Sequence, residues 1–283
     1  MQPAEPVRSG LTHLGVVAWV LGVTFVLGAV GQPLLFLVSG AGNDLIVLVG
    51  AEAAVYLAGS ALFSARRPAS SFEDVFALRR VPLGLLVSVF FLGLAAHAPA
   101  DKLSDIIFKH WPLKKDLSDA LAAQLEPRGL VHAVVLALFV AGVGPFVEEL
   151  FFRGALYTGL RSTASAASSV VTTGLMFTLI HLEAREWPSI FLLAVCLGTV
   201  RAVSGSTWPG VVLHVAFNGS ALALAWLGPK TEALWLSPAV VAASSVAALL
   251  LLALSVWLAQ KSELAERARA LDGAAPTPGG ATP

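Results

Sequence analysis

The chain of 283 residues is 57% hydrophobic and only 13% charged, and it has no net charge at pH 7. Soluble domains carry about 25% charged residues, so this composition excludes an ordinary water-soluble fold. Nucleic-acid binding calls for a basic stripe, and nothing in this charge-balanced sequence suggests one. The single cysteine, Cys196, excludes an internal disulfide bond.

The apolar segments predict an all-α, polytopic membrane protein. A transmembrane helix needs about 20 mostly apolar residues, and a helix satisfies its own backbone hydrogen bonds within lipid. About eight windows meet this requirement, and we expect the helices to enclose an intramembrane cavity. The windows are Leu14–Val38, Leu45–Ala65, Val81–Ala98, Leu130–Leu160, Ser165–Leu182, Trp187–Val203, Trp208–Leu227 and Leu234–Gln260.

The spacing of the windows indicates one transmembrane domain over residues 1–270. The polar segment Asp101–Gly129 mixes lysines and aspartates with apolar residues, which is typical of amphipathic helices at the membrane interface, so we expect a rim or lid there. The fourth window is over-long and is expected either to protrude or to bend near Gly144 and Pro145. Residues 271–283, rich in proline and glycine, are expected to form a disordered tail.

Basic residues in short loops predict the orientation in the membrane, because cytoplasmic loops carry an excess of Lys and Arg. Such residues crowd the connection after the second window and follow the last one, which predicts that both termini are cytoplasmic. The bias toward Ala, Leu, Val and Gly favours a bacterial cell membrane. The basic residues are Arg66, Arg67, Arg79, Arg80, Lys261, Arg267 and Arg269.

Two adjacent carboxylates interrupt the apolar fourth window. A charged side chain inside a span costs at least about 2.5–3.5 kcal/mol, so each one indicates a functional site by default. Glu149 and Arg153 are four residues apart and can form an ion pair on one helix face. Glu148 points about 100° away around the helix. It has no local partner and can act as a general base on a water molecule.

Further polar residues occur in two later windows. His181 lies near the end of the fifth window, and His214 and Asn218 share one face of the seventh. The last two can direct hydrogen bonds to one point, as stabilisation of an oxyanion requires. Each of these residues has a structural alternative, because histidine and asparagine also form hydrogen bonds between membrane helices. Glu52 is left as structural or unassigned.

The sequence leaves three classes of function open. In an enzyme, Glu148, His181, His214 and Asn218 form a catalytic cluster. In a transporter or channel, the same buried acids and histidines form a proton relay, which inverted repeats would favour. In a catalytically inactive scaffold, they bind a partner's membrane helix. The sequence has no recognisable inverted repeat, which disfavours the transporter. We favour the enzyme because the four residues recur in similar positions with complementary chemistry.

Three motifs carry a resemblance to a known family. They are Glu-Glu-x-x-x-Arg at Glu148–Arg153, Phe-x-x-x-His at Phe177–His181 and His-x-x-x-Asn at His214–Asn218. Their types and order are similar to those of the CPBP (Abi) family, which includes the CAAX prenyl endopeptidases. The resemblance implies an eight-span intramembrane endopeptidase and a catalytic motif region over residues 130–227.

The resemblance also implies roles for the motif residues. Glu148 and His181 would activate a water molecule, and His214 and Asn218 would stabilise the oxyanion. Glu149, Arg153 and Phe177 would be structural or orient the site. The family is described both as intramembrane metalloproteases and as metal-independent glutamate proteases. No cofactor is firmly expected, although Glu148, His181 and His214 could bind zinc; we favour direct activation of water by Glu148.

The family resemblance implies a membrane-associated peptide or protein as the substrate and the lipid bilayer as the environment. Bacterial members are associated with peptide maturation, with self-immunity to bacteriocins and with processing of C-terminal sorting tails. The sequence does not choose among these substrates, and it does not indicate an oligomeric state.

Overall fold

The computed structural model describes residues 11–26, 45–67, 70–181 and 183–273. Within these ranges the regular structure is helical. The elements are α1 His13–Val26, α3 Leu45–Ala65, α4 Phe72–Val75, α5 Leu83–His110, α6 Lys115–Leu125, α7 Leu130–Leu138, η2 Phe139–Val143, α8 Gly144–Glu149, η3 Leu150–Leu156, α9 Tyr157–Leu160, α10 Ala166–Ile180, η4 Ala184–Glu186, α11 Trp187–Ser204, α12 Trp208–Leu227, α13 Pro229–Trp235 and α14 Pro238–Gly273.

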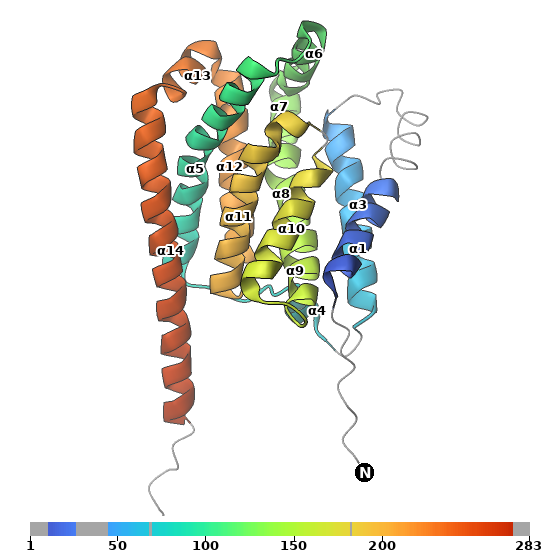
Figure 1. The fold of residues 1–283 in the computed structure, drawn as a ribbon, viewed down its shortest axis with the longest axis vertical. Coiled ribbons are helices and arrows are strands. Elements are labelled where there is room, and N and C mark those ends of the chain that lie inside the picture. The colour runs from blue at the N-terminus through green and yellow to red at the C-terminus, as the bar shows by residue number, and fades with distance from the viewer. Residues whose placement is uncertain (1–10, 27–44, 68–69, 182, 274–283) are drawn as a thin grey trace, which may run out of the picture.

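The structure is an all-α polytopic bundle, as the sequence predicts (Figure 1). In the described residues, six helices are long and apolar enough to cross a membrane, and α1 and α10 are shorter apolar helices. The helices α3 and α12 have the bounds expected from the sequence. Residues 27–38 of the first expected span and residues 274–283 of the expected tail lie outside the described residues. Residues 271–273, expected in the tail, belong to α14.

The third span continues beyond its expected end at Ala98. Helix α5 runs on to His110 and takes in the first part of the segment expected to lie at the interface, with Pro99 inside the helix. Side-chain pairs one turn apart support this extension: His97 with Asp101, and Asp105 with both Lys102 and Lys109. The short helix α6 lies at one end of the bundle and has no buried residue (Figure 1).

The fourth span is a continuous helical segment from Leu130 to Leu160 that changes its pitch twice. Two π-helical segments, η2 and η3, lie on either side of α8, which contains Gly144 and Pro145. Proline has no amide hydrogen, so the ordinary α-helical bond to the carbonyl of Ala141 cannot form there. Short π-helical segments inside α-helices are frequent at functional sites, and here they flank both glutamates.

The helices carrying the motifs lie in the middle of the bundle, with α1 and α3 on one side and α14 on the other (Figure 1). Close packing at glycines brings these helices together. A Cβ atom on Gly93 of α5 would lie 2.3 Å from the carbonyl oxygen of Leu213 in α12. One on Gly198 of α11 would lie 2.8 Å from Cγ1 of Val170 in α10. Such small-residue contacts allow membrane helices to pack backbone against backbone.

Helix α12 begins inside the molecule. Ser206 and Thr207, just before it, are fully buried. The Thr207 hydroxyl donates to the carbonyl of Phe76 at 2.7 Å, and the Thr207 amide donates to the carbonyl of Ala77 at 2.9 Å. The segment after α4 therefore covers the start of α12. This buried start explains how His214, less than two turns into α12, reaches the depth of the glutamates in the fourth span.

Candidate active site

The ion pair expected in the fourth span is present and fully buried. An Nη1 hydrogen of Arg153 donates to Oε1 of Glu149 at 2.7 Å, and both side chains are 0% exposed. The same guanidinium donates to the carbonyl of Ala194 in α11 at 3.3 Å. Its carbon Cζ lies 4.5 Å from the centre of the Phe177 ring. These contacts fix Arg153 between α10 and α11, so Glu149 is held on a rigid support.

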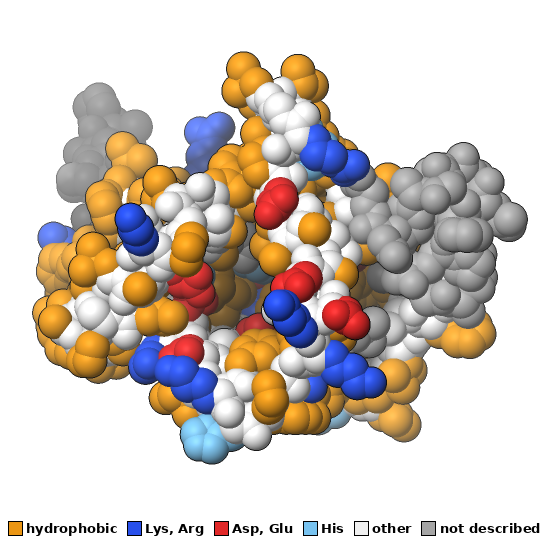
Figure 2. Space-filling view, turned by 90° about the horizontal axis from the view of Figure 1, so that it is seen from above, with side chains coloured by type: hydrophobic (Ala, Val, Ile, Leu, Met, Phe, Trp, Pro, Cys, Tyr) orange, Lys and Arg blue, Asp and Glu red, His pale blue; other side chains and the backbone are white. Residues whose placement is uncertain are grey.

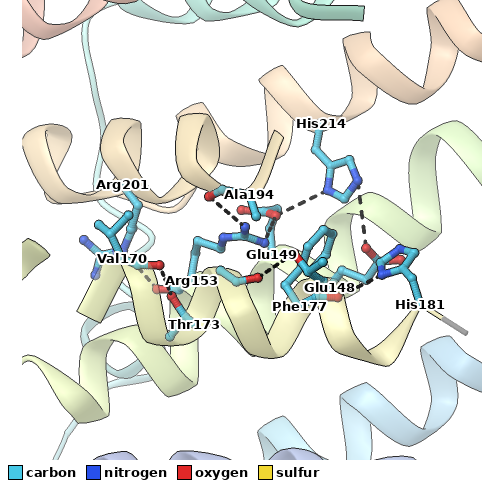
Figure 3. A network of polar contacts seen from close by, with 12 residues as sticks. Glu148, Glu149, Arg153, Val170, Thr173, Phe177, His181, Ala194, Arg201 and His214 are labelled. Carbon is cyan, nitrogen blue, oxygen red and sulfur yellow. Dashed lines mark hydrogen bonds and ion pairs between the residues drawn. The ribbon is translucent and has the colours of Figure 1, made fainter. Parts of the chain in front are cut away.

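Glu149 also orients His214. Nδ1 of His214 lies 3.3 Å from Oε1 of Glu149, the oxygen that also accepts from Arg153 (Figure 3). A carboxylate paired with arginine accepts hydrogen bonds, so Nδ1 of His214 carries a hydrogen and Nε2 faces away from Glu149. Gly210, one turn earlier in α12, makes this approach possible, because a Cβ atom there would lie 2.7 Å from Oε2 of Glu149.

Glu148 faces the other ring nitrogen of His214. The distance from Oε2 of Glu148 to Nε2 of His214 is 3.9 Å. This distance is too long for a direct hydrogen bond, but one water molecule about 2.8 Å from each atom fits beside them. The Glu148 side chain is 12% exposed, whereas that of Glu149 is 0% exposed. The two adjacent glutamates thus differ in exposure. They also differ in partners, because Glu149 is paired with Arg153 and Glu148 is not.

His181 lies beside this pair. It follows α10, and its Nδ1 lies 2.8 Å from the carbonyl oxygen of Phe177. A carbonyl only accepts hydrogen bonds, so Nδ1 of His181 donates and Nε2 is free of hydrogen in the neutral ring. The Phe177 ring contacts both histidine rings, with centroids 4.9 Å from His181 and 5.7 Å from His214. Figure 3 shows the side chains of Glu148, His181 and His214 grouped together.

Asn218 is held one helical turn after His214 by a contact to the fourth span. Its side-chain amide donates to the carbonyl of Val140 in η2 at 3.1 Å. The side-chain amide has two hydrogens, so one remains for another acceptor. The π-helical segment η2 thus supplies the carbonyl that positions Asn218.

The structure adds Glu52, left unassigned by the sequence, to this group. Val49 of α3 approaches Gly144, with Cγ1 3.3 Å from where a Cβ would stand, and Tyr56 stacks on Phe151 with ring centroids 5.0 Å apart. Glu52 lies between these two contacts on the same face of α3, opposite Glu148, with which it interacts electrostatically. Tyr56 forms a hydrogen bond with Glu52. The spacing of Glu52 and Tyr56, one turn apart, is the only local sign of this pair in the sequence.

The histidines His97 and His132 lie elsewhere. His97 packs against Phe217 and Trp235, and its Nε2 contacts Asp101 at 3.2 Å. His132 contacts Arg128. Cys196 packs beside a hydrophobic cluster that includes Leu193 and Leu197.

A metal centre is not assembled by the described residues. In these ranges, no group of three or more His, Cys, Asp or Glu side chains is arranged to hold a metal ion. The three-ligand zinc site of Glu148, His181 and His214 therefore does not fit this arrangement of side chains.

The end of the bundle that carries α6 and α13 is hollowed. Seen from this end, acidic and basic side chains border a central depression, and further acidic side chains lie deeper within it (Figure 2). Helix α6 is fixed beside α12 by the Trp226 indole, whose Nε1 donates to the carbonyl of Leu125 at 2.8 Å. Charged side chains therefore line the depression at this end of the bundle.

The fold and the site together define a polytopic membrane protein in which glutamate and histidine side chains cluster inside the membrane-spanning helices. Residues 130–220 match the model of a family described as type II CAAX prenyl endopeptidase Rce1-like. The matched region contains all three motifs and confirms the family resemblance. The match covers about a third of the chain, so it shows what this region is similar to. No curated protein and no solved structure is significantly similar to this chain.

Proposed function

We propose that this protein is an intramembrane endopeptidase that uses Glu148 to activate a water molecule. The observation that carries the proposal is the position of Glu148: it is the solvent-accessible member of the acid pair, and its Oε2 lies 3.9 Å from Nε2 of His214. An oxygen and a nitrogen at this distance can both hydrogen-bond to one water molecule, which suits general-base hydrolysis.

In the proposed reaction, Glu148 takes a proton from the water, and the resulting hydroxide attacks the carbonyl carbon of the substrate's peptide bond. Nε2 of His181 accepts a hydrogen bond from the same water and orients it. The negative charge on the carbonyl oxygen is stabilised by the second amide hydrogen of Asn218 and by His214. Glu148 then gives its proton to the leaving nitrogen, which breaks the carbon–nitrogen bond.

The buried groups behind the site have a positioning role in this proposal. Glu149 accepts from both Arg153 and His214, so it holds the imidazole at a fixed angle. Glu52 and Tyr56 form a further polar layer on the α3 side of Glu148.

We further propose that the substrate is a membrane-associated protein or peptide in a bacterial cell membrane, and that both termini of the chain are cytoplasmic. Basic residues support this orientation, because those near α3, α5 and α14 gather at the end opposite α6 (Figure 1). The hollowed end then opens away from the cytoplasm. That placement favours the processing of C-terminal sorting tails or the maturation of exported peptides.

The decisive experiment compares newly formed protein termini in membranes of cells that express the wild-type chain or Glu148→Gln. General-base catalysis contributes about 10²–10⁴-fold, so termini that depend on the protein should fall below detection in Glu148→Gln at equal expression. The exposed Glu126 at the end of α6 provides a matched control, and Glu126→Gln should retain all of them. If every terminus survives Glu148→Gln, the chain is not a Glu148-dependent protease, and the scaffold alternative takes its place.

A further inference from the structure

A polar pocket lies at the end of the bundle opposite α6 and α13. Its volume is about 370 Å³, and the N-terminal end of α5, the C-terminal end of α11 and one side of α14 form its walls. Pockets of about 300–1,000 Å³ are typical of sites that bind small molecules or headgroups. None of the three motifs contributes to it. Residues that carry its polarity are Arg79, Arg80, Ser204, Ser262 and Glu263.

Two adjacent arginines dominate the charge of this pocket. Arg79 and Arg80 are exposed, and their guanidinium groups make no ion pair or hydrogen bond with other described residues. Glu263 is the one acidic side chain of the lining. The first turn of α5, which begins next to the arginines, has no side-chain cap. Its free amide hydrogens add the positive end of a helix dipole to the two cations.

Hydrogen bonds fix the position of the backbone that carries Arg79 and Arg80. The Ser206 hydroxyl donates to the carbonyl of Arg79 at 2.7 Å. Two further hydrogen bonds join Thr207 to Phe76 and Ala77, just before the arginines. Ser206 and Thr207 are both 0% exposed. The backbone that carries Arg79 and Arg80 is therefore pre-organised, which lowers the entropic cost of binding an anion.

Neighbouring side chains indicate that the pocket lies at the level of lipid headgroups. Nζ of Lys261 lies 5.0 Å from the centre of the Trp257 ring on α14, close to the pocket residues Ser262 and Glu263. Tryptophan and lysine in this arrangement are typical of the membrane–water interface. Leu83, Val87 and Phe91 form an exposed apolar stripe along α5.

We propose that this pocket binds the phosphate of an anionic phospholipid. Basic pockets between transmembrane helices on the cytoplasmic side are the usual binding sites for anionic headgroups. Two arginines can each donate paired hydrogen bonds to phosphate oxygens. The site is separate from Glu148, so this inference does not depend on the proposed protease activity.

The test uses the full-length protein in mixed micelles of non-ionic detergent and phosphatidylcholine, titrated with phosphatidylglycerol. Native mass spectrometry measures the bound lipid. We expect wild type to retain phosphatidylglycerol in preference to phosphatidylcholine. The double variant Arg79→Gln/Arg80→Gln should bind it about 30-fold more weakly, which is the factor for losing two basic residues at an anionic surface. Arg79→Lys/Arg80→Lys keeps both positive charges and should keep most of the binding. This variant therefore distinguishes an effect of charge from an effect of misfolding.

The matched control removes two adjacent cations at the other end of the bundle. Lys114→Gln/Lys115→Gln, at the exposed start of α6, should leave the binding of phosphatidylglycerol unchanged. Equal binding by wild type and Arg79→Gln/Arg80→Gln overturns the proposal, as does an equal loss in the α6 control.

Inorganic phosphate in millimolar excess distinguishes the two sources of the anion. If it displaces all phosphatidylglycerol, the pocket is a site for soluble phosphate, and the lipid assignment is wrong.

Discussion

At the scale of single residues, two adjacent glutamates have opposite environments. Glu149 is enclosed with Arg153 and His214, whereas Glu148 reaches solvent. Helical geometry alone separates the two side chains by about 100°, so neighbours in sequence serve different purposes. One carboxylate neutralises a buried cation, and the other remains available for chemistry.

This difference predicts opposite effects of the same substitution. Glu149→Gln leaves the fully buried Arg153 without its carboxylate, and removal of one partner of a buried pair costs about 3–5 kcal/mol. Glu148→Gln removes no ion pair of that kind and should change the free energy of unfolding by about 1 kcal/mol or less. Thermal unfolding of the two purified variants in the same detergent measures the contrast. Equal losses of stability would contradict this account of the pair.

Several residues of the candidate site could be predicted from the sequence, and the reasons are local. Charged and polar side chains stand out within apolar windows, and the four-residue spacing of Glu149 and Arg153 predicts their ion pair. The contact between Glu149 and His214 could not be predicted, because it depends on how α12 packs on α8. The same holds for Glu52, whose place opposite Glu148 follows from the packing of α3 at Val49 and Tyr56.

At the scale of helices, the contact between α5 and α12 sets the position of His214. A Cβ atom on Gly93 would stand 2.3 Å from the carbonyl oxygen of Leu213, the residue before His214, and 2.9 Å from Cβ of Ala216. Backbone atoms on a helix cannot move aside alone. Any side chain at position 93 must therefore push α12, and His214 with it, away from α5.

We expect Gly93→Ala to destabilise the protein by about 1–3 kcal/mol, the usual cost of overpacking. It should also lower the rate of Glu148-dependent cleavage more than that loss of folded protein explains. Gly84→Ala in the same helix meets nothing within 4 Å and should leave both quantities unchanged or slightly improved. Thermal unfolding and a cleavage assay on both variants test this. Wild-type activity in folded Gly93→Ala would show that this contact does not position His214.

The bounds of most helices follow from hydropathy, but their internal pitch does not. Apolar runs predict α3 and α12 with their observed ends, since the ends coincide with loops rich in polar residues, glycine or proline. The π-helical segments η2 and η3 leave no comparable sign, apart from Pro145 between them. The extension of α5 differs from the sequence prediction, because the mixture of charged and apolar residues after Ala98 is also typical of separate helices at the membrane interface. Their charges instead pair along one continuous helix.

At the scale of the whole molecule, the positive-inside rule predicts that α4 and α6 lie on opposite sides of the membrane (Figure 1). In a Cys196→Ser background, Glu73→Cys on α4 and Lys115→Cys on α6 place one thiol at each end. Both positions are exposed. A membrane-impermeant maleimide added to intact spheroplasts should label Lys115→Cys only, and Glu73→Cys only after lysis. The reverse pattern would invert the orientation.

The small exposed fraction of Glu148 has a consequence for what can be cut. In a substrate that crosses the bilayer as a helix, each peptide carbonyl is engaged by an amide four residues further along the chain. Neighbouring turns also surround each carbonyl and block the approach of the attacking water molecule. A polypeptide hydrolysed at this depth must therefore fray before it reacts. Helix-breaking residues near the scissile bond would then set which chains are processed, before any side chain is recognised.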